Sequence, residues 1–428
     1  MIRNGRLLCW YDVFYKPLSI VLLFVFLYCG AALLFPYTGS VGVVYGVVLL
    51  LLFVLFFLFF SLCMFGVGAP LISGRRFRFA ESGSSVLPFV FSIVGIAFLV
   101  VDKVYFRGID FFNMSPAEIR NKISSESGGG VSSIFSLIGN VLQCFVVVAA
   151  FNSVFKDSGF RFFIMQALFL TIVFASSYLL GGRTPLLTYL VIIFSVYILS
   201  GRAASTFAAA KFMLPAIFVA LAFALTIFSL RARAIGIESS EYLSAMLLHL
   251  GAANVESSLA EEGGAFRDGL NYFYVVVAYL IHPFWVSSEI ALGSGGGGSV
   301  SFYTLQFLLS KFIYIDLSSA KHAYYQLFSS LPGGLYYDYG FVGVLLYSFF
   351  LAVVGYVGVV VLVLSRGRAV VGRMLIVFCL ATLLLSPLLH SLNFVFFLFY
   401  MSVLFGYAFY KDLLCLLFFL LSGEAVRK

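Results

Sequence analysis

The sequence predicts an all-α polytopic membrane protein: a helix bundle of about ten to twelve transmembrane helices with one large loop outside the membrane. Of its 428 residues, 62% are hydrophobic and only 10% are charged, and the mean hydropathy is +1.09. Soluble globular chains carry about 25% charged residues. The apolar residues also occur in runs of about 20, the length that crosses a bilayer as a helix.

Ten apolar runs are clear candidates for membrane spans. Seven precede the large loop: 18–36, 40–64, 86–102, 132–155, 162–180, 185–200 and 212–230. Three follow it: 341–364, 370–389 and 391–410. We therefore divide the chain into an N-terminal membrane bundle at 1–230, a large loop at 231–340, and C-terminal spans with a tail at 341–428.

Lysine and arginine in the short connections predict the orientation, because cytoplasmic loops keep an excess of these residues. A cytoplasmic N-terminus places 16 of the 26 basic residues on the cytoplasmic side, and the other ten are spread over much longer loops. Both termini are then cytoplasmic, and the loops at 103–131 and 231–340 are periplasmic or extracellular. The net charge of +8 reflects this arrangement and does not indicate nucleic-acid binding.

The large loop contains two apolar stretches, Asn271 to Ala291 and Ser301 to Leu317, with a glycine-rich run between them. Either both span the membrane or neither does, because one extra span would move Arg366 and Arg368 to the outer side. Both stretches contain polar residues, such as His282 in the first. We expect two interfacial or shallow re-entrant helices, with a pair of spans as the alternative.

Cysteine usage and short motifs exclude several classes of protein. The six cysteines lie within or beside apolar runs, where a disulfide is not expected, and no CxxC or HExxH pattern is present. No Walker, Rossmann or GxSxG pattern supports a soluble-type hydrolase or a nucleotide enzyme. We therefore expect no cofactor, no metal centre and no soluble-type hydrolase.

Four arginines are candidates for binding an anionic group at the outer face. Arg183 lies between two spans in Gly-Gly-Arg-Thr-Pro, where it either reaches a phosphate or anchors the turn. Arg231 and Arg233 close the span at 212–230, and Arg267 lies deeper in the large loop. On a continuous helix Arg231 and Arg233 point about 200° apart, so they share one anion only if the helix ends before them. A diphosphate clamp and a set of outer-leaflet anchors are the two interpretations.

Candidate acid or base residues also come from the large loop. It contains His249, Glu256, Glu261, Glu262, His282, His322 and Asp338. A histidine ionises near neutral pH without tuning, and His322 lies in a polar setting. Asp338 precedes glycines that permit close helix packing, so a structural role is the alternative there. We expect His390, at the outer end of a span, to cap the helix or donate a hydrogen bond.

Three of these features together resemble the Wzy-type O-antigen polymerases, the oligosaccharide repeat-unit polymerase family. They are GGRTPLL at 181–187, the arginines at the start of the large loop, and above all GGLYYDYGFVGVLLYSFFLAVVG at 333–355. The order of spans and loops resembles that of the family along the whole chain, whereas the matching motifs cover about 30 residues.

The resemblance implies a glycosyltransferase of the bacterial inner membrane, acting at the periplasmic face. It would polymerise undecaprenyl-diphosphate-linked oligosaccharide repeat units into O-antigen or surface polysaccharide, with no cofactor and with a chain-length regulator protein as a partner. The implied diphosphate-binding residues are Arg183, Arg231, Arg233 and Arg267. The implied base is His322, Asp338 or Glu256. Related ligases place a histidine just before the span that follows the large loop, a neighbourhood that Tyr337 and Asp338 occupy in this chain. A lipid-linked oligosaccharide flippase or an O-antigen ligase is the alternative function.

Overall fold

A computed structural model describes most of the chain. The residues described are 10–35, 42–72, 83–110, 114, 133–180, 184–202, 206–250, 264–293, 299–301, 303, 306, 329–391 and 394–421. Every regular element among them is a helix. In chain order these are α1 (Trp10–Val13), α2 (Tyr15–Leu33), α3 (Val44–Ile72), α4 (Val86–Val101), the π-helix η1 (Asp102–Phe106), α6 (Ile134–Gln143), α7 (Phe145–Lys156), α8 (Gly159–Leu179), α9 (Thr184–Leu199), α10 (Thr206–Ile235), α11 (Ser239–His249), α12 (Gly264–Ala291), α14 (Leu331–Leu364), α15 (Val370–Leu385) and α16 (Val395–Leu421).

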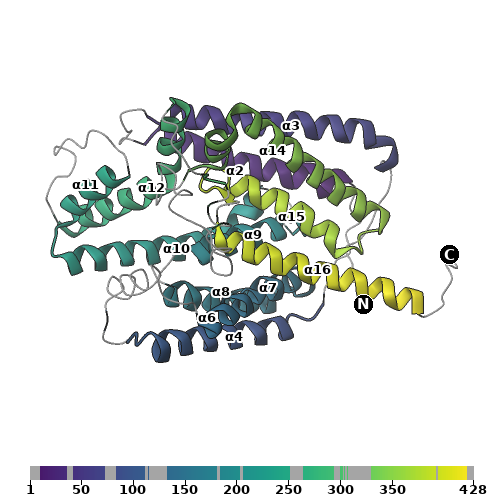
Figure 1. Cartoon of the computed structure of the whole chain (residues 1–428), viewed down its shortest axis with the longest axis horizontal. Coiled ribbons are helices and arrows are strands. Elements are labelled where there is room, and N and C mark those ends of the chain that lie inside the picture. The colour runs from purple at the N-terminus through teal and green to yellow at the C-terminus, as the bar shows by residue number, and fades with distance from the viewer. Residues whose placement is uncertain are drawn as a thin grey trace.

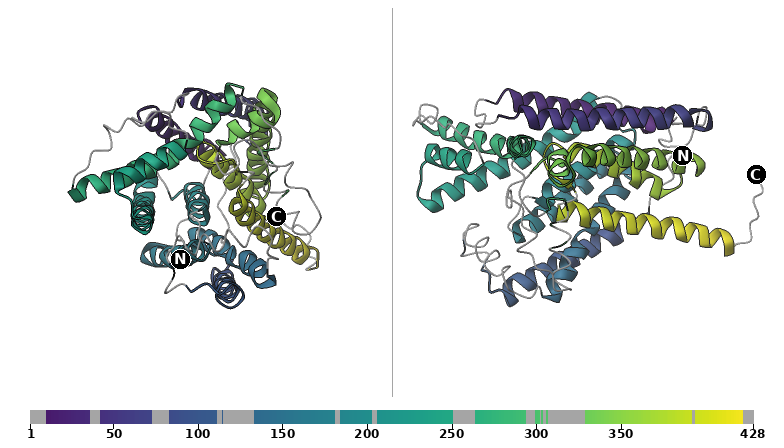
Figure 2. Two further views of the ribbon diagram at one scale, coloured as in Figure 1. Left: turned by 60° about the vertical axis from the view of Figure 1, so that its left-hand side comes forward. Right: turned by 45° about the horizontal axis from the view of Figure 1, so that its top comes forward.

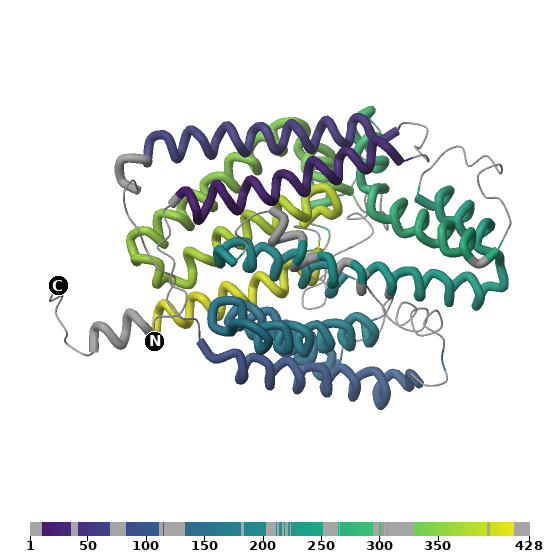
Figure 3. Tube along the Cα trace, turned by 180° about the vertical axis from the view of Figure 1, so that it is seen from behind, coloured from purple at the N-terminus to yellow at the C-terminus, as the bar shows by residue number. Residues whose placement is uncertain are grey.

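Eight segments of the described chain are long and apolar enough to cross a membrane, and α9 and α15 are shorter apolar helices. The expected all-α, multi-pass membrane protein is therefore confirmed. Most helix axes lie roughly side by side (Figure 1). α14 packs on α3 and α15, and α4 packs on α6 and α7. Figures 1 and 3 show α9 and α16 between these two groups of helices.

Large apolar side chains occupy both the interior and the outward faces of the bundle. Inside, Phe14 and Phe65 are buried with ring centroids 4.7 Å apart. On the outside, Leu27, Phe59 and many other large apolar residues are exposed. A soluble monomer rarely exposes such contiguous apolar surface, whereas a lipid-facing surface requires it.

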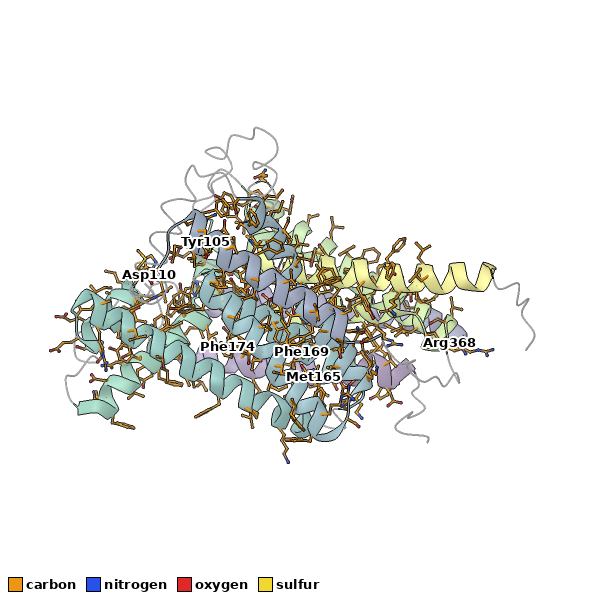
Figure 4. All side chains as sticks on the ribbon, turned by 90° about the horizontal axis from the view of Figure 1, so that it is seen from below. Tyr105, Asp110, Met165, Phe169, Phe174 and Arg368 are labelled. Carbon is orange, nitrogen blue, oxygen red and sulfur yellow. The ribbon has the colours of Figure 1, made fainter. Side chains whose placement is uncertain are left out.

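The bundle has two distinct ends. α11 and the start of α12 lie at one end, on the left of Figure 1, which we call the α11 end. The turn from Ser365 to Ala369 lies at the opposite end, on the right. In Figure 4, Asp110 and Arg368 mark the α11 end and the opposite end. Figure 2 shows that the last turns of α16 also extend toward the opposite end.

α12 is longer than the stretch expected at 271–291. It is one helix of 28 residues with Pro283 inside it, and the part from Phe266 to Ala291 is long and apolar enough to cross a membrane. Several of its contacts nevertheless lie at the α11 end. The ring of Phe35, just after α2, faces Tyr274 and Trp285.

α12 also meets the beginning of α3 and the beginning of α14. The backbone N–H of Gly46, the third residue of α3, donates to Ser288 Oγ at 2.8 Å. Ser287 Oγ lies 2.6 Å from Ser330 Oγ, just before α14. The chain between α10 and α14 therefore leaves and re-enters the bundle at the same end, which favours a shallow α12. The second stretch, 301–317, lies almost entirely outside the described residues.

α14 begins ten residues before the expected span at 341–364. Ser330 caps it by accepting a hydrogen bond from Gly333 N–H at 3.2 Å, and Pro332 occupies the first turn. The helix is interrupted at Gly340, with φ 61° and ψ −156°, a conformation open essentially only to glycine. The end of the predicted large loop is therefore helical.

Candidate functional site

An open groove of about 390 Å³ lies between α10 and α12 at the α11 end. It is lined by Leu225, Thr226, Ser229, Leu230 and Arg233 of α10 and by Gly269 and Tyr272 of α12. Arg233 is the last of the five α10 residues along the helix. The groove is apolar beside Leu225 and Leu230, carries hydroxyls at its middle, and ends at a guanidinium. This combination can accommodate a lipid chain with an anionic head group.

α11 fixes the first turns of α12. Ser239 Oγ donates to Asp268 at 2.5 Å and accepts from Asn271 Nδ2 at 3.0 Å. Asp268 and Asn271 are three residues apart and so face α11 together, while Gly269 and Tyr272 face α10. Because the hydrogen bonds set the rotation of α12, they also set the wall of the groove.

The arginines predicted to bind one diphosphate do not point toward a common place. α10 remains helical through Ile235, so the condition for Arg231 and Arg233 to share one anion is not met, and the two side chains point about 200° apart. Arg233 is exposed and lines the groove. Arg231 is partly buried on the other side of Ala232, which is itself fully buried. Arg267 also points about 200° away from the groove residue Gly269 on α12.

Of the four predicted arginines, the structure therefore places Arg233 in the groove and turns Arg231 and Arg267 elsewhere. Arg183 lies outside the described residues, as do the predicted bases His322 and Glu256 and the neighbouring Glu261 and Glu262. His249 is described and is exposed at the end of α11.

Asp338 binds the backbone of the turn at 299–301. Its Oδ1 accepts from Val300 N–H at 2.8 Å, and its Oδ2 accepts from Ser301 N–H at 2.6 Å and from Ser299 Oγ at 3.2 Å. Both carboxylate oxygens are thus engaged by protein donors. This geometry supports the structural alternative for Asp338, in which it joins the end of the glycine-rich run to α14.

His390 belongs to the same polar cluster. Its Nε2 lies 3.1 Å from Ser301 Oγ, and both side chains are buried, with 4% and 2% exposed. A Cβ at Gly334 would overlap the imidazole, and one at Gly333 would overlap Ser287. The two glycines that begin the 333–355 motif are therefore sites of close packing. Ser301 and Asp338 lie 89 and 52 positions before His390, so spacing in the sequence gave no reason to connect the three residues. The one signal in the sequence is that each is a polar residue in an apolar stretch.

The groove and the polar cluster occupy different parts of α12. Tyr272 lines the groove and Ser287 contacts the start of α14. The two are 15 residues apart, or about 22 Å along a helix. A base must lie within about 3 Å of the proton that it accepts. The structure thus does not bring Asp338 together with Arg233.

A second charged cluster lies at the end of α4. The buried Asp102 forms ion pairs with Arg107 (3.1 Å) and Lys103 (3.7 Å) and accepts a hydrogen bond from Ser133 Oγ. Ser133 in turn caps α6 by accepting from Ser136 N–H. The cluster ties the two ends of the predicted 103–131 loop together, which assigns it a structural role.

Comparisons of the chain with protein-family models, with curated proteins and with solved structures found no match.

Proposed function

We propose that the protein polymerises undecaprenyl-diphosphate-linked oligosaccharide repeat units at the periplasmic face of the bacterial inner membrane. The observation that carries this proposal is the groove between α10 and α12. Its apolar wall fits part of an isoprenoid chain, and Arg233 at its end fits the diphosphate. The charge bias of the loops supports a periplasmic position for this end of the bundle.

The reaction needs two contributions from the protein. The acceptor hydroxyl attacks the anomeric carbon of the growing glycan, a new C–O bond forms, and the bond to the lipid diphosphate breaks. The guanidinium of Arg233 stabilises the charge that develops on the leaving diphosphate. A base takes the proton of the acceptor hydroxyl. With Asp338 engaged by the 299–301 turn, His322 and Glu256 are the bases that we retain from the sequence.

A flippase would move the same lipid without bond chemistry and would place charges inside its spans. Among the described residues, the buried Asp, Lys and Arg side chains are Asp102, Lys103, Asp157 and Arg373. All four lie within four residues of a helix end. This distribution differs from the one that we expect of a flippase.

A surface-glycan gel of a deletion strain tests the proposal. We expect single repeat units on the lipid A core, because export and ligation continue while polymerisation stops. Core alone would identify a flippase or a ligase instead. An unchanged ladder of chain lengths would refute all three functions.

A further inference from the structure

Gly269, in the wall of the groove, is not explained by the fold. It lies inside α12, where glycine is less favourable than alanine. Its φ is not positive, and a Cβ there would meet nothing within 4 Å, so neither conformation nor packing requires glycine. The missing side chain leaves open space on the α12 side of the groove.

The hydroxyl of Ser229, on the α10 side of the groove, is available to a ligand. Ser229 is partly exposed there, and it forms no hydrogen bond within the described part of the chain. Thr226 lines the same groove but donates its hydroxyl proton to the carbonyl oxygen of Ala222 at 2.8 Å. Thr226 can therefore only accept a hydrogen bond from a ligand, whereas Ser229 can donate one.

Ser229 and Arg233 lie on one face of α10. They are four residues apart, which places one side chain above the other with a separation of about 6 Å along the helix axis. Side chains of a helix lean toward its N-terminus, so Arg233 leans back toward Ser229. The groove thus presents a guanidinium and a hydroxyl donor side by side, with the space at Gly269 in its other wall.

Contacts hold the α12 wall in place before a ligand binds. The ring of Tyr272 lies 6.2 Å from that of Tyr242 on α11, measured between centroids, and Tyr242 is buried. The hydrogen bonds of Ser239 to Asp268 and Asn271 hold the same turns of α12. A site that is ordered in advance loses little conformational entropy when a ligand arrives.

The ends of the two helices add little net charge to the groove. Arg233 lies in the last turn of α10, where the helix carbonyls disfavour an anion, and the groove also includes the early turns of α12, where the N–H groups favour one. These two effects oppose each other. The side chains of Arg233 and Ser229 therefore decide how well the groove binds an anion.

We propose that Ser229 and Gly269 make the groove selective for a lipid-linked diphosphate. Arg233 binds one phosphate through its charge, Ser229 donates a hydrogen bond to the other, and the missing side chain of Gly269 leaves room for the head group. A monophosphate engages only one of the two donors well. This inference rests on the proposed function, because it assigns further contacts to the same lipid-linked substrate.

The test measures binding to the full-length protein in nanodiscs of neutral lipid. The probes are farnesyl diphosphate, farnesyl monophosphate and inorganic diphosphate. We expect the wild type to bind farnesyl diphosphate about tenfold more tightly than the monophosphate, the effect of one further hydrogen bond to a charged group. Inorganic diphosphate is expected to bind more weakly than farnesyl diphosphate, because it leaves Leu225 and Leu230 without an apolar partner.

Ser229→Ala tests the second donor. It is expected to weaken the binding of farnesyl diphosphate about tenfold and to change that of the monophosphate by no more than about twofold. Thr226→Val is the matched control, because the hydroxyl proton that it removes is already donated to Ala222. This variant is expected to keep the preference for the diphosphate.

Gly269→Ala and Gly269→Leu test the space in the wall. Alanine is expected to maintain or raise the melting temperature, since it favours the helix and its Cβ meets no neighbour, and yet to weaken the binding of farnesyl diphosphate. Leucine is expected to weaken it further. Gly406→Ala and Gly406→Leu on α16 are the matched controls, because a Cβ on Gly406 also meets nothing within 4 Å.

Each outcome supports or overturns the selectivity. Equal affinity of the wild type for the two farnesyl ligands, or no binding of either, overturns it. A Ser229→Ala variant that keeps the preference, or Gly269 variants that bind like the Gly406 controls, overturns the role of that residue. Equal affinity for inorganic and farnesyl diphosphate overturns the lipid part and identifies a site for a soluble diphosphate.

The proposed function fails by a different result. A normal polymer ladder in the deletion strain would refute the polymerase and leave a measured preference for lipid diphosphates standing. Single repeat units in that strain, without any preference between the farnesyl ligands, would keep the polymerase and overturn the selectivity of the groove.

Discussion

Oδ1 of Asp338 lies 2.8 Å from the backbone nitrogen of Val300, and Oδ2 lies 2.6 Å from that of Ser301, so one carboxylate binds two successive amides. We expect Asp338→Ala to destabilise the protein by about 1–3 kcal/mol, the cost of leaving buried donors unpaired. Asp338→Asn is expected to retain part of this stability, because its single carbonyl oxygen can still accept. Thermal unfolding of the purified protein in detergent measures both. A loss of activity with an unchanged melting temperature would identify Asp338 as the catalytic base instead.

Gly46 allows α3 to cross α12 in backbone contact. A Cβ at this position would overlap the carbonyl oxygen of Phe284 and lie 2.9 Å from its Cα, and neither backbone atom can rotate away. We expect Gly46→Ala to cost about 1–3 kcal/mol through overpacking. Gly66→Ala on the same helix is the matched control, because a Cβ there meets nothing within 4 Å. Equal melting temperatures for the two variants would contradict the crossing.

Arg233 is expected to matter most among the arginines of the large loop. Arg233→Ala removes the guanidinium at the end of the groove, and a hydrogen bond to a charged group contributes about 1.5–3 kcal/mol. We therefore expect long-chain glycan to fall roughly tenfold to a hundredfold at constant protein level. Arg231→Ala and Arg267→Ala, which point away from the groove, are the controls and should have smaller effects. The reverse order on a glycan gel would argue against the groove as the diphosphate site.

Asp412 caps a neighbouring helix. Its two carboxylate oxygens accept from Val370 N–H and Val371 N–H, both at 2.9 Å, at the start of α15. We expect Asp412→Ala to lower stability by about 1 kcal/mol, as the loss of an N-terminal cap does. Asp412→Asn keeps an acceptor oxygen and should lose less. Fluorescence-detected gel filtration after heating ranks the variants; no difference between Asp412→Ala and wild type would contradict the cap.

The proposed orientation can be tested by cysteine labelling. In a background without native cysteines, Leu248→Cys places a thiol on α11, where Leu248 is 73% exposed. Arg368→Cys places one at the opposite end of the bundle, where Arg368 is also exposed. A reagent that does not cross the inner membrane should label position 248 in intact spheroplasts and position 368 only after lysis. The opposite pattern would invert the topology.

Most of the fold could be predicted from the sequence because a membrane span is specified by local composition. Each of the ten expected spans falls on helical chain, although 132–155 is divided into α6 and α7 and α10 is not among the eight described segments that are long and apolar enough to cross a membrane. The misjudged boundaries have local causes. α14 starts earlier than expected because Ser330 and Pro332 begin a helix that Gly340 then interrupts. The residues before Gly340 are less apolar than the span after it, so the hydropathy of the sequence did not join the two parts into one helix.

The candidate site was less predictable because it depends on contacts between distant segments. Arg233 was identified by its charge alone, and its groove exists only where α12 returns to α10. The pairing of Ser301 with His390 joins residues 89 positions apart. If the end of α10 at Ile235 had been known, helical periodicity would have shown that Arg231 and Arg233 point in different directions.

The position of α12 has a consequence for biosynthesis. α10 ends and α14 begins at the same end of the bundle. In the proposed orientation, a shallow α12 has to pass through the translocon, although its most apolar window has a mean hydropathy of 1.3, high enough for a span. His282, Ser287, Ser288 and Glu289 lower the tendency of its second half to partition into lipid, because polar and charged residues oppose insertion. Replacing them with leucine would be expected to trap α12 in the bilayer during synthesis and reverse every later span.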